Sequence, residues 1–401
     1  MAVTPKPIHL AVLFAVSAGC GAPPVQLTEA TRVAIVGARL IDGTSAAPIS
    51  DAVVVIRDDR IEAVGTRADT SVPSGAEVFD GTGKTVVPGF VETHAHYHGD
   101  LARVDEQLRK QLYFGVTTSR SIGSDPPEKV ARLLGARAGK IPGPRMYTAG
   151  LGFSYPDGFP PGLPVHRPSS EEEARALVRN LAGQGVHFIK MWVNEMPEPG
   201  FKIRPEIRAA IVDEALVHHL VPVAHIAEEA DLRQLSQIGV RDFLHTVGDA
   251  DVGEELIQLV LDRGVGFSPT LTNIQAGWNF VDHPEVLEDP EIRAAFEPEA
   301  FARWNDPVGR EQTLVDPGLA SRRARFARAM AFVKTVSDAG VPVAVGTDSG
   351  ASSWNVPMGW GTHRELQLFV DAGLTPMQAL VAATRTGAEV LSQGEADYGT
   401  L

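Results

Sequence analysis

Residues able to bind metal ions recur along this chain at the ends of short apolar segments. The stretch FVETHAHYHG, residues 90–99, brings together His94, His96 and His98. Side chains two residues apart on a strand point the same way, so His94 and His96 can bind one ion from one face. His98 has the same parity but lies beyond the strand, and we expect it to be a loop residue.

Four more candidate ligands lie on other apolar segments: Lys190, His225, His245 and Asp348. Taken singly, each has an ordinary structural explanation, such as an ion pair for a lysine or a helix cap for an aspartate. Their joint occurrence at matching segment ends predicts one metal site. Cys20 is the only cysteine, so the ligands must be nitrogen and oxygen atoms.

The elements that would position these residues begin after Pro88-Gly89. Nearly all-apolar segments then alternate with helical stretches, as in βα units around a buried parallel sheet. Eight parallel strands predict an α/β fold of the (β/α)8 type, with its chemistry at the carboxyl ends of the strands. A doubly wound sheet is the alternative, but no glycine-rich phosphate loop follows the first strand. The eight expected strands are residues 90–94, 115–121, 145–150, 186–192, 221–226, 240–246, 265–271 and 341–348.

Two connections in this pattern are unusually long. One follows the third strand, LGFSYPDGFPPGLPVHRP, and the other follows the seventh and contains Trp278, Phe280 and Trp304. Long loops in compact domains are usually functional lids or mobile segments. In a barrel we expect both on the active face. The residues before the barrel, about 32–87, alternate with tight turns and predict a small antiparallel β unit.

The first 24 residues have a different character. A basic Lys6, an apolar run and then small residues are typical of a secretory signal peptide. Cys20 follows Ser-Ala-Gly, as at a lipoprotein processing site, so it is either the lipidated residue or removed by ordinary cleavage. We therefore expect export to the periplasm or cell envelope, with membrane attachment only through a lipid at Cys20.

Charge narrows the choice of partners. The formal net charge is −14 and the pI is about 5.3. Such an acidic chain is not expected to bind nucleic acid or an anionic membrane. A small-molecule substrate is the expected partner.

Several motifs resemble those of the metal-dependent amidohydrolase superfamily, nearest to its prolidase-like, imidazolonepropionase-related branch. They are ARLIDGTSAAP, DRIEAVG, GKTVVPGFVETHAH, GVTTSRS, IKMW, AVGTDSG and ELQLFVDAGLTPMQALVAATRTGAEVL. The resemblance implies a (β/α)8 barrel over residues 89–391 and a small β-sandwich domain built mainly from residues 25–88. Residues 392–401 would start the return to that sandwich. Relatives continue beyond this point, so either the chain is truncated or its sandwich is smaller, and an exposed sheet edge would favour a homo-oligomer.

The resemblance also implies a centre of two divalent metal ions, most simply Zn2+. His94, His96 and Asp348 would bind the first ion, and His225 and His245 the second. Lys190 would be carboxylated by CO2 to N6-carboxylysine and bridge both. An ammonium between two cations would be strongly repelled, whereas a carbamate is an anionic ligand.

This set implies a hydrolase in which a metal-bridging hydroxide attacks an amide C–N bond, with Asp348 as catalytic proton acceptor and donor. A dipeptide or N-acyl amino acid is the expected substrate. A mononuclear ring deaminase, with Glu228 or Glu229 as proton shuttle, and a cyclic-amide or lactone hydrolase are the enzyme alternatives. The alternative from another class is an exported binding lipoprotein on a barrel scaffold.

Three residues are candidate substrate contacts. Arg120 matches an arginine common in this branch and could bind a substrate carboxylate, or form a structural ion pair. His363, with Arg364 beside it, is another candidate for the carboxylate. Tyr97 could donate a hydrogen bond to the developing oxyanion. Ser121 stands where an acidic residue often follows the arginine.

Overall fold

The computed structural model describes residues 32–194, 202–249, 251–296, 298–350 and 356–401. The predicted signal peptide, with Cys20, lies outside these ranges. The chain divides into two compact units, one that runs to Gly89 and includes Asp397–Leu401, and one that comprises Phe90–Ala396. Among the helices of the described ranges, none combines the length and the apolar composition needed to cross a bilayer.

The smaller unit is a five-stranded sheet in the order β3-β2-β1-β4, with β5 also paired to β1. β1 is antiparallel to β2 and parallel to β4 and β5. Valine, isoleucine and alanine side chains pack on both sides of β1 and β2 in two separate clusters. At the C-terminus, the Leu401 amide donates to the Asp42 carbonyl at 2.9 Å. The strands are β1 (Arg32–Leu40), β2 (Ile49–Arg57), β3 (Arg60–Thr66), β4 (Glu77–Asp80) and β5 (Thr85–Val86).

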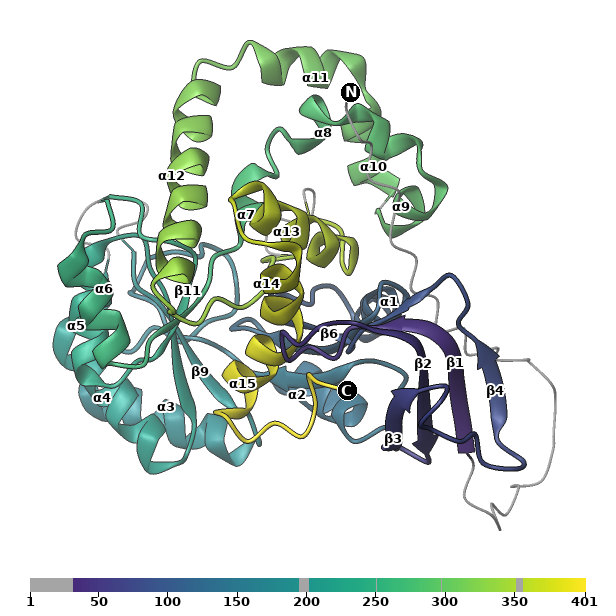
Figure 1. The fold of residues 1–401 in the computed structure, drawn as a ribbon. Helices are drawn as coiled ribbons and strands as arrows, with labels where there is room; N and C mark the ends of the chain where they lie inside the picture. Colours follow the sequence, from purple (N-terminus) through teal and green to yellow (C-terminus); the bar gives the residue numbers. More distant parts are fainter. Residues whose placement is uncertain (1–31, 195–201, 250, 297, 351–355) are drawn as a thin grey trace. The chain divides into compact units, whose positions relative to one another are not determined.

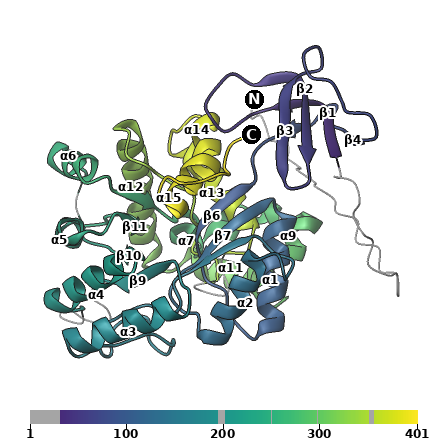
Figure 2. The ribbon, with the colours of Figure 1, turned by 90° about the horizontal axis from the view of Figure 1, so that it is seen from below.

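The larger unit is the expected (β/α)8 barrel (Figures 1 and 2). Strands β6-β7-β8 and β9-β10-β11-β12 form two parallel sheets, joined by a bridge between Phe153 and Met191. The eighth segment, residues 341–349, closes the ring, because Val343 bridges to Phe267 and Ser349 bridges to Ala95. The strands are β6 (Phe90–Ala95), β7 (Val116–Ser121), β8 (Arg145–Thr148), β9 (Phe188–Trp192), β10 (Val221–His225), β11 (Asp242–Leu244) and β12 (Gly266–Ser268).

Helices cover the outside of this ring, as Figure 2 shows for α3 and α4. Helix α3 begins after Ser170, which caps it because the Ser170 hydroxyl accepts from the Glu173 amide at 3.2 Å. The helices that follow the first six strands are α1 (Leu101–Tyr113), α2 (Pro127–Arg137), α3 (Glu171–Gly183), α4 (Pro205–Val217), α5 (Glu229–Ile238) and α6 (Glu254–Asp262). After the eighth come α13 (Trp360–Asp371), α14 (Pro376–Val381), a π-helical turn (Ala382–Thr386) and α15 (Gly387–Ser392).

The connection after the seventh strand is helical rather than an open loop (Figure 1, green). Asp289 and Asp306 cap two of its helices, each with proline as the first helical residue. Phe280, Phe296 and Trp304 pack into one aromatic cluster, so this segment has its own small core. Its elements are α7 (Leu271–Gln275), α8 (Asn279–Asp282), a 3-10 turn (Pro284–Glu288), α9 (Pro290–Ala295), α10 (Pro298–Asn305), α11 (Pro307–Leu314) and α12 (Leu319–Asp338).

Candidate metal centre

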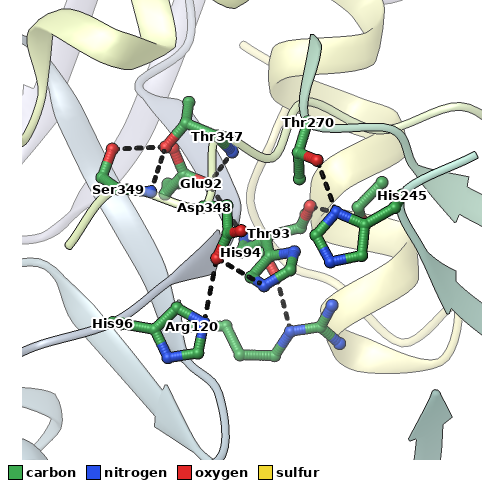
Figure 3. Close-up of polar contacts among 11 residues, drawn as sticks. Glu92, Thr93, His94, His96, Arg120, His245, Thr270, Thr347, Asp348 and Ser349 are labelled. Carbon is green, nitrogen blue, oxygen red and sulfur yellow. Dashed lines mark hydrogen bonds and ion pairs between the residues drawn. The ribbon is translucent and has the colours of Figure 1, made fainter. Parts of the chain in front are cut away.

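Two histidines and an aspartate meet where the first and eighth barrel strands end (Figure 3). His94 Nε2 lies 3.1 Å from Asp348 Oδ1, and His96 Nε2 lies 3.0 Å from the same oxygen. Backbone pairing sets this geometry, since the Asp348 amide donates to the His94 carbonyl and the His96 amide to the Ser349 carbonyl, each at 2.7 Å. Strand alternation thus places the two histidines on one face, and the neighbouring eighth segment places Asp348 beside them.

The histidines after β10 and β11 lie beside this group. The His225 and His245 ring centroids are 4.2 Å apart, and those of His94 and His245 are 5.0 Å apart. His94, His245 and Asp348 each offer one ligand atom, and these atoms lie within 4.8 Å of one another. His245 Nδ1 is engaged separately, 2.6 Å from the Thr270 hydroxyl. Side chains from four strands therefore converge at the same end of the barrel.

Lys190, in the middle of β9, is fully buried next to this group. Its Nζ has no hydrogen-bond partner in the described part of the chain and lies 4.9 Å from the centre of the Trp192 ring. Burial lowers the pKa of Lys190 from 10.5 to about 7. Gly123 and Gly152 approach closely, since a Cβ there would lie 2.8 and 3.0 Å from Lys190 Cγ. The site leaves room for the lysine stem and holds its nitrogen without a partner.

The electrostatics suit metal binding. Burial lowers the pKa of His94 to about 3 and holds the pKa values of His225 and His245 well below 6.5. Burial alone would raise the pKa of Asp348, but contact with His94 and His96 brings it well below its usual value. Neutral imidazoles and an ionised carboxylate are the protonation states that bind metal. Imidazole nitrogen and carboxylate oxygen are also donors that zinc accepts, so the residues present fit such an ion.

Arg120 is engaged with neighbouring residues and is not exposed to a substrate carboxylate. Its side chain is fully buried, Nε donates to the Thr93 carbonyl at 2.6 Å, and Nη1 pairs with Asp242. The guanidinium also lies over the Phe188 ring, 4.6 Å from its centre. The structure therefore supports the structural ion pair rather than the substrate contact.

Tyr97 and His363 are also engaged in contacts with residues outside the histidine group. Tyr97 is fully buried in an apolar cluster, and its hydroxyl donates to Ser119 Oγ at 3.0 Å. His363 Nε2 donates to the Phe114 carbonyl at 2.8 Å, and its ring packs edge-on against Phe90 at 5.3 Å. Both side chains are used in packing and hydrogen bonds with neighbouring elements.

His98 and Arg364 are also engaged with residues other than the histidines. The His98 amide and ring contact the side chain of Gln107 in α1, as expected for a loop residue outside the ligand set. Arg364 donates to the Gln275 side chain from both Nε, at 3.1 Å, and Nη2, at 2.9 Å. Neither residue is brought to the histidines.

Glu92 is a buried carboxylate that sequence reasoning missed. Its Oε1 accepts from the amides of His94 and Thr347, both at 2.9 Å, and its Oε2 accepts from the Thr362 hydroxyl at 3.1 Å. It thus holds together the two strands that carry His94 and Asp348. Its position could have been inferred from the sequence, since Glu92 stands two residues before His94 and so lies on the same side of the strand.

The long connection after β8 reaches the candidate centre. The Phe159 ring lies 5.9 Å from the His225 ring, and Phe159 itself is half-buried. Arg167 braces this loop by donating to the carbonyls of Tyr155, Gly158 and Pro160 at 2.9–3.0 Å. This connection therefore lies on the face of the barrel that carries the histidines, as expected from the sequence.

Several known proteins are similar to this chain in sequence or in structure. The ochratoxinase of Aspergillus niger is 25% identical over 414 residues, covering 90% of this chain and 77% of its own. The imidazolonepropionase of Nocardia farcinica is 25% identical over 361 residues, covering 88% and 82%. A crystal structure assigned as a prolidase from Bifidobacterium longum superposes with a TM-score of 0.72 at 27% identity, covering 92% and 86%.

The family model gives the most direct assignment. The model described as "Amidohydrolase family" matches residues 85–396, most of the chain and the whole of the barrel. Members of this family generally depend on metal, in agreement with the His and Asp group at the barrel mouth. The chain belongs to the amidohydrolase family and is a hydrolase that acts on carbon–nitrogen bonds.

Proposed function

We propose that this hydrolase uses two divalent metal ions, most simply Zn2+, held by six side chains. His94, His96 and Asp348 would bind one ion and His225 and His245 the other, with carboxylated Lys190 as a shared ligand. The observation that carries the proposal is the buried Lys190 Nζ, which has no partner among the described residues although it lies beside the ligands. Carbamylation requires an unprotonated amine, and the lowered pKa of Lys190 supplies one near neutral pH.

The protein's own groups would perform the proton transfers. When bound, the metal ions would lower the pKa of a water molecule and polarise the substrate carbonyl. Asp348, ionised beside the two histidines, accepts a proton from the attacking water and returns it to the leaving nitrogen. Burial of Asp348 strengthens its hydrogen bond to the attacking water, because few competing waters reach the carboxylate.

For the substrate, we propose a dipeptide or N-acyl amino acid with an apolar group beside the scissile amide. Likeness to a prolidase and to ochratoxinase supports an amide of this type. Phe159 beside His225 supports the apolar group, since it gives the mouth an aromatic wall. No role in binding the substrate carboxylate is assigned to Arg120 or His363, which are engaged elsewhere.

The deaminase alternative has less support. It requires a free glutamate near His225 as proton shuttle. Glu228 Oε2 instead accepts from Lys202 at 3.1 Å, and Glu229 Oε1 accepts from Arg233 at 2.6 Å. Glu228 is therefore paired with Lys202, which precedes α4, and Glu229 with Arg233 of its own helix.

A substrate panel tests the reaction. Xaa-Pro and other dipeptides, N-acyl amino acids, a lactone and a ring amidine are assayed with the zinc- and bicarbonate-loaded chain. We expect amino-acid release from a dipeptide or N-acyl amino acid, reduced about 10²- to 10⁴-fold in Asp348→Asn, because that change removes the proton acceptor. Ammonia release from the ring amidine without amide cleavage would establish the deaminase instead. Turnover of the lactone alone would favour the cyclic-ester alternative.

We also propose that the chain is exported and lipid-anchored at Cys20. The support is the signal-peptide pattern of residues 1–24, in which Cys20 follows small residues. Metabolic labelling with a radioactive fatty acid should mark the wild-type chain and not Cys20→Ser. Equal labelling of both, or none, would contradict the anchor.

A further inference from the structure

Thr270 makes an unusual contact with a candidate metal ligand (Figure 3). It follows β12, is fully buried, and its hydroxyl oxygen lies 2.6 Å from His245 Nδ1. Its backbone is in the left-handed region, with φ 55° and ψ 45°. A β-branched residue is rarely found there, so the surrounding structure must hold it in place.

Glu365 of α13 supplies the restraint. This fully buried carboxylate accepts from the two amides that directly follow Thr270, Leu271 at 2.8 Å and Thr272 at 2.6 Å. It also accepts from the Thr272 hydroxyl at 2.6 Å. A carboxylate that receives three hydrogen bonds at one turn fixes the backbone of that turn.

The contact determines which nitrogen of His245 can bind metal. A neutral imidazole carries one proton, and a nitrogen that carries it cannot be a ligand. Nδ1 is occupied by the Thr270 hydroxyl, so Nε2 is the nitrogen left for an ion, and it can bind one in the tautomer in which Nδ1 carries the proton and donates to that hydroxyl. The His245 backbone is held as well, because its amide donates to the Ser268 carbonyl at 2.8 Å. Such outer hydrogen bonds set the tautomer and ring orientation of metal-binding histidines.

We propose that Thr270 and Glu365 are positioning residues for the second metal ion: Glu365 holds the turn, and Thr270 presents His245 as an Nε2 ligand. The inference rests on the proposed assignment of His245 as a ligand. It concerns residues that touch neither the ion nor the substrate. Its consequence is that the ion bound by His225 and His245 should be selectively weakened when the contact is lost.

The variants can separate this role from simple packing. Thr270→Val removes the hydroxyl and keeps the β-branched shape, whereas Thr270→Ser keeps the hydroxyl. Glu365→Gln replaces one carboxylate oxygen with an amide nitrogen, which cannot accept a hydrogen bond. In either orientation that nitrogen faces a backbone amide of Leu271 or Thr272. Thr384→Val is the matched control, because it removes a buried hydroxyl that donates to the Leu380 carbonyl in a π-helical turn.

The experiment is a titration of metal-free chain with Co2+ in bicarbonate buffer, followed by visible absorption, with thermal melting to verify folding. Wild type, Thr270→Ser and Thr384→Val should bind two ions with the same spectrum. Thr270→Val and Glu365→Gln should bind the second ion about 10- to 100-fold more weakly, with an altered spectrum. If Thr270→Val folds and titrates like wild type, the inference is overturned and the proposed centre stands. If wild type binds fewer than two ions, both are overturned.

Discussion

Asp348 Oδ1 lies 3.1 Å from His94 Nε2, although one residue ends the eighth barrel segment and the other the first strand. The relationship follows from the closed barrel, in which the last segment pairs with the first strand. Glu92 reinforces it by accepting backbone amides from both. The distances between Asp348 and the histidines are therefore set by the barrel rather than by a loop.

The Arg120–Asp242 pair should be a determinant of stability. Removing one partner leaves the other charge buried without compensation, so we expect Arg120→Met to lower the free energy of unfolding by about 3–5 kcal/mol. Urea denaturation of the metal-free chain measures this. The double variant Arg120→Met/Asp242→Leu should recover part of the loss. A stable Arg120→Met chain with a raised KM would restore the substrate role.

Phe159 should determine substrate preference. Phe159→Ala removes the aromatic wall beside His225, so we expect KM for substrates with an apolar side chain to rise roughly 10-fold, with little change in kcat. Substrates with a glycine at that position should be affected less. Phe159→Leu serves as the control that keeps an apolar surface. A uniform loss of kcat on every substrate would contradict the proposed contact.

Glu92 should make stability depend on pH. Burial raises the pKa of Glu92 from 4.5 to about 7. The contribution of protonated Glu92 to the free energy of unfolding is therefore complete below pH 4.5 and is lost as pH rises through about 7. Glu92→Gln keeps an acceptor for the two amides and has no charge to bury. As pH rises from about 4.5 to about 8, the free energy of unfolding of this variant should increase relative to that of wild type by on the order of 3 kcal/mol.

Thermal and urea unfolding of metal-free protein across that range measure the difference. The exposed Glu128→Gln provides the control for loss of a surface charge. A constant difference between Glu92→Gln and wild type at all pH values would show that Glu92 does not titrate in this window.

The barrel and its histidine group were predictable because both depend on local patterns. Each of the eight expected apolar segments corresponds to a strand or, for residues 341–348, to the segment that closes the ring. Strand alternation placed His94 and His96 on one face, and the barrel rule placed His225, His245 and Asp348 at the same end. Their roles as ligands remain predictions.

The supporting residues were not predictable in the same way. Arg120, Tyr97 and His363 have side chains suited to substrate binding, but their direction depends on packing between elements distant in sequence. Glu365 is the first residue of the quoted segment ELQLFVDAGLTPMQALVAATRTGAEVL, but that segment does not predict its partners, which follow a strand far earlier in the chain. The helical segment from α7 to α12 was expected as a long loop, since most of its helices are short and its one long helix, α12, has no side-chain cap at its start.

The number of metal ions per chain tests the central claim most directly. Protein expressed with zinc and bicarbonate is analysed by inductively coupled plasma mass spectrometry, beside Lys190→Ala and Lys190→Met, the second of which keeps the length of the buried stem. The proposed centre predicts about two ions in wild type and a clear decrease in both variants. One ion per chain, unchanged by either substitution, would contradict the bridging role of Lys190.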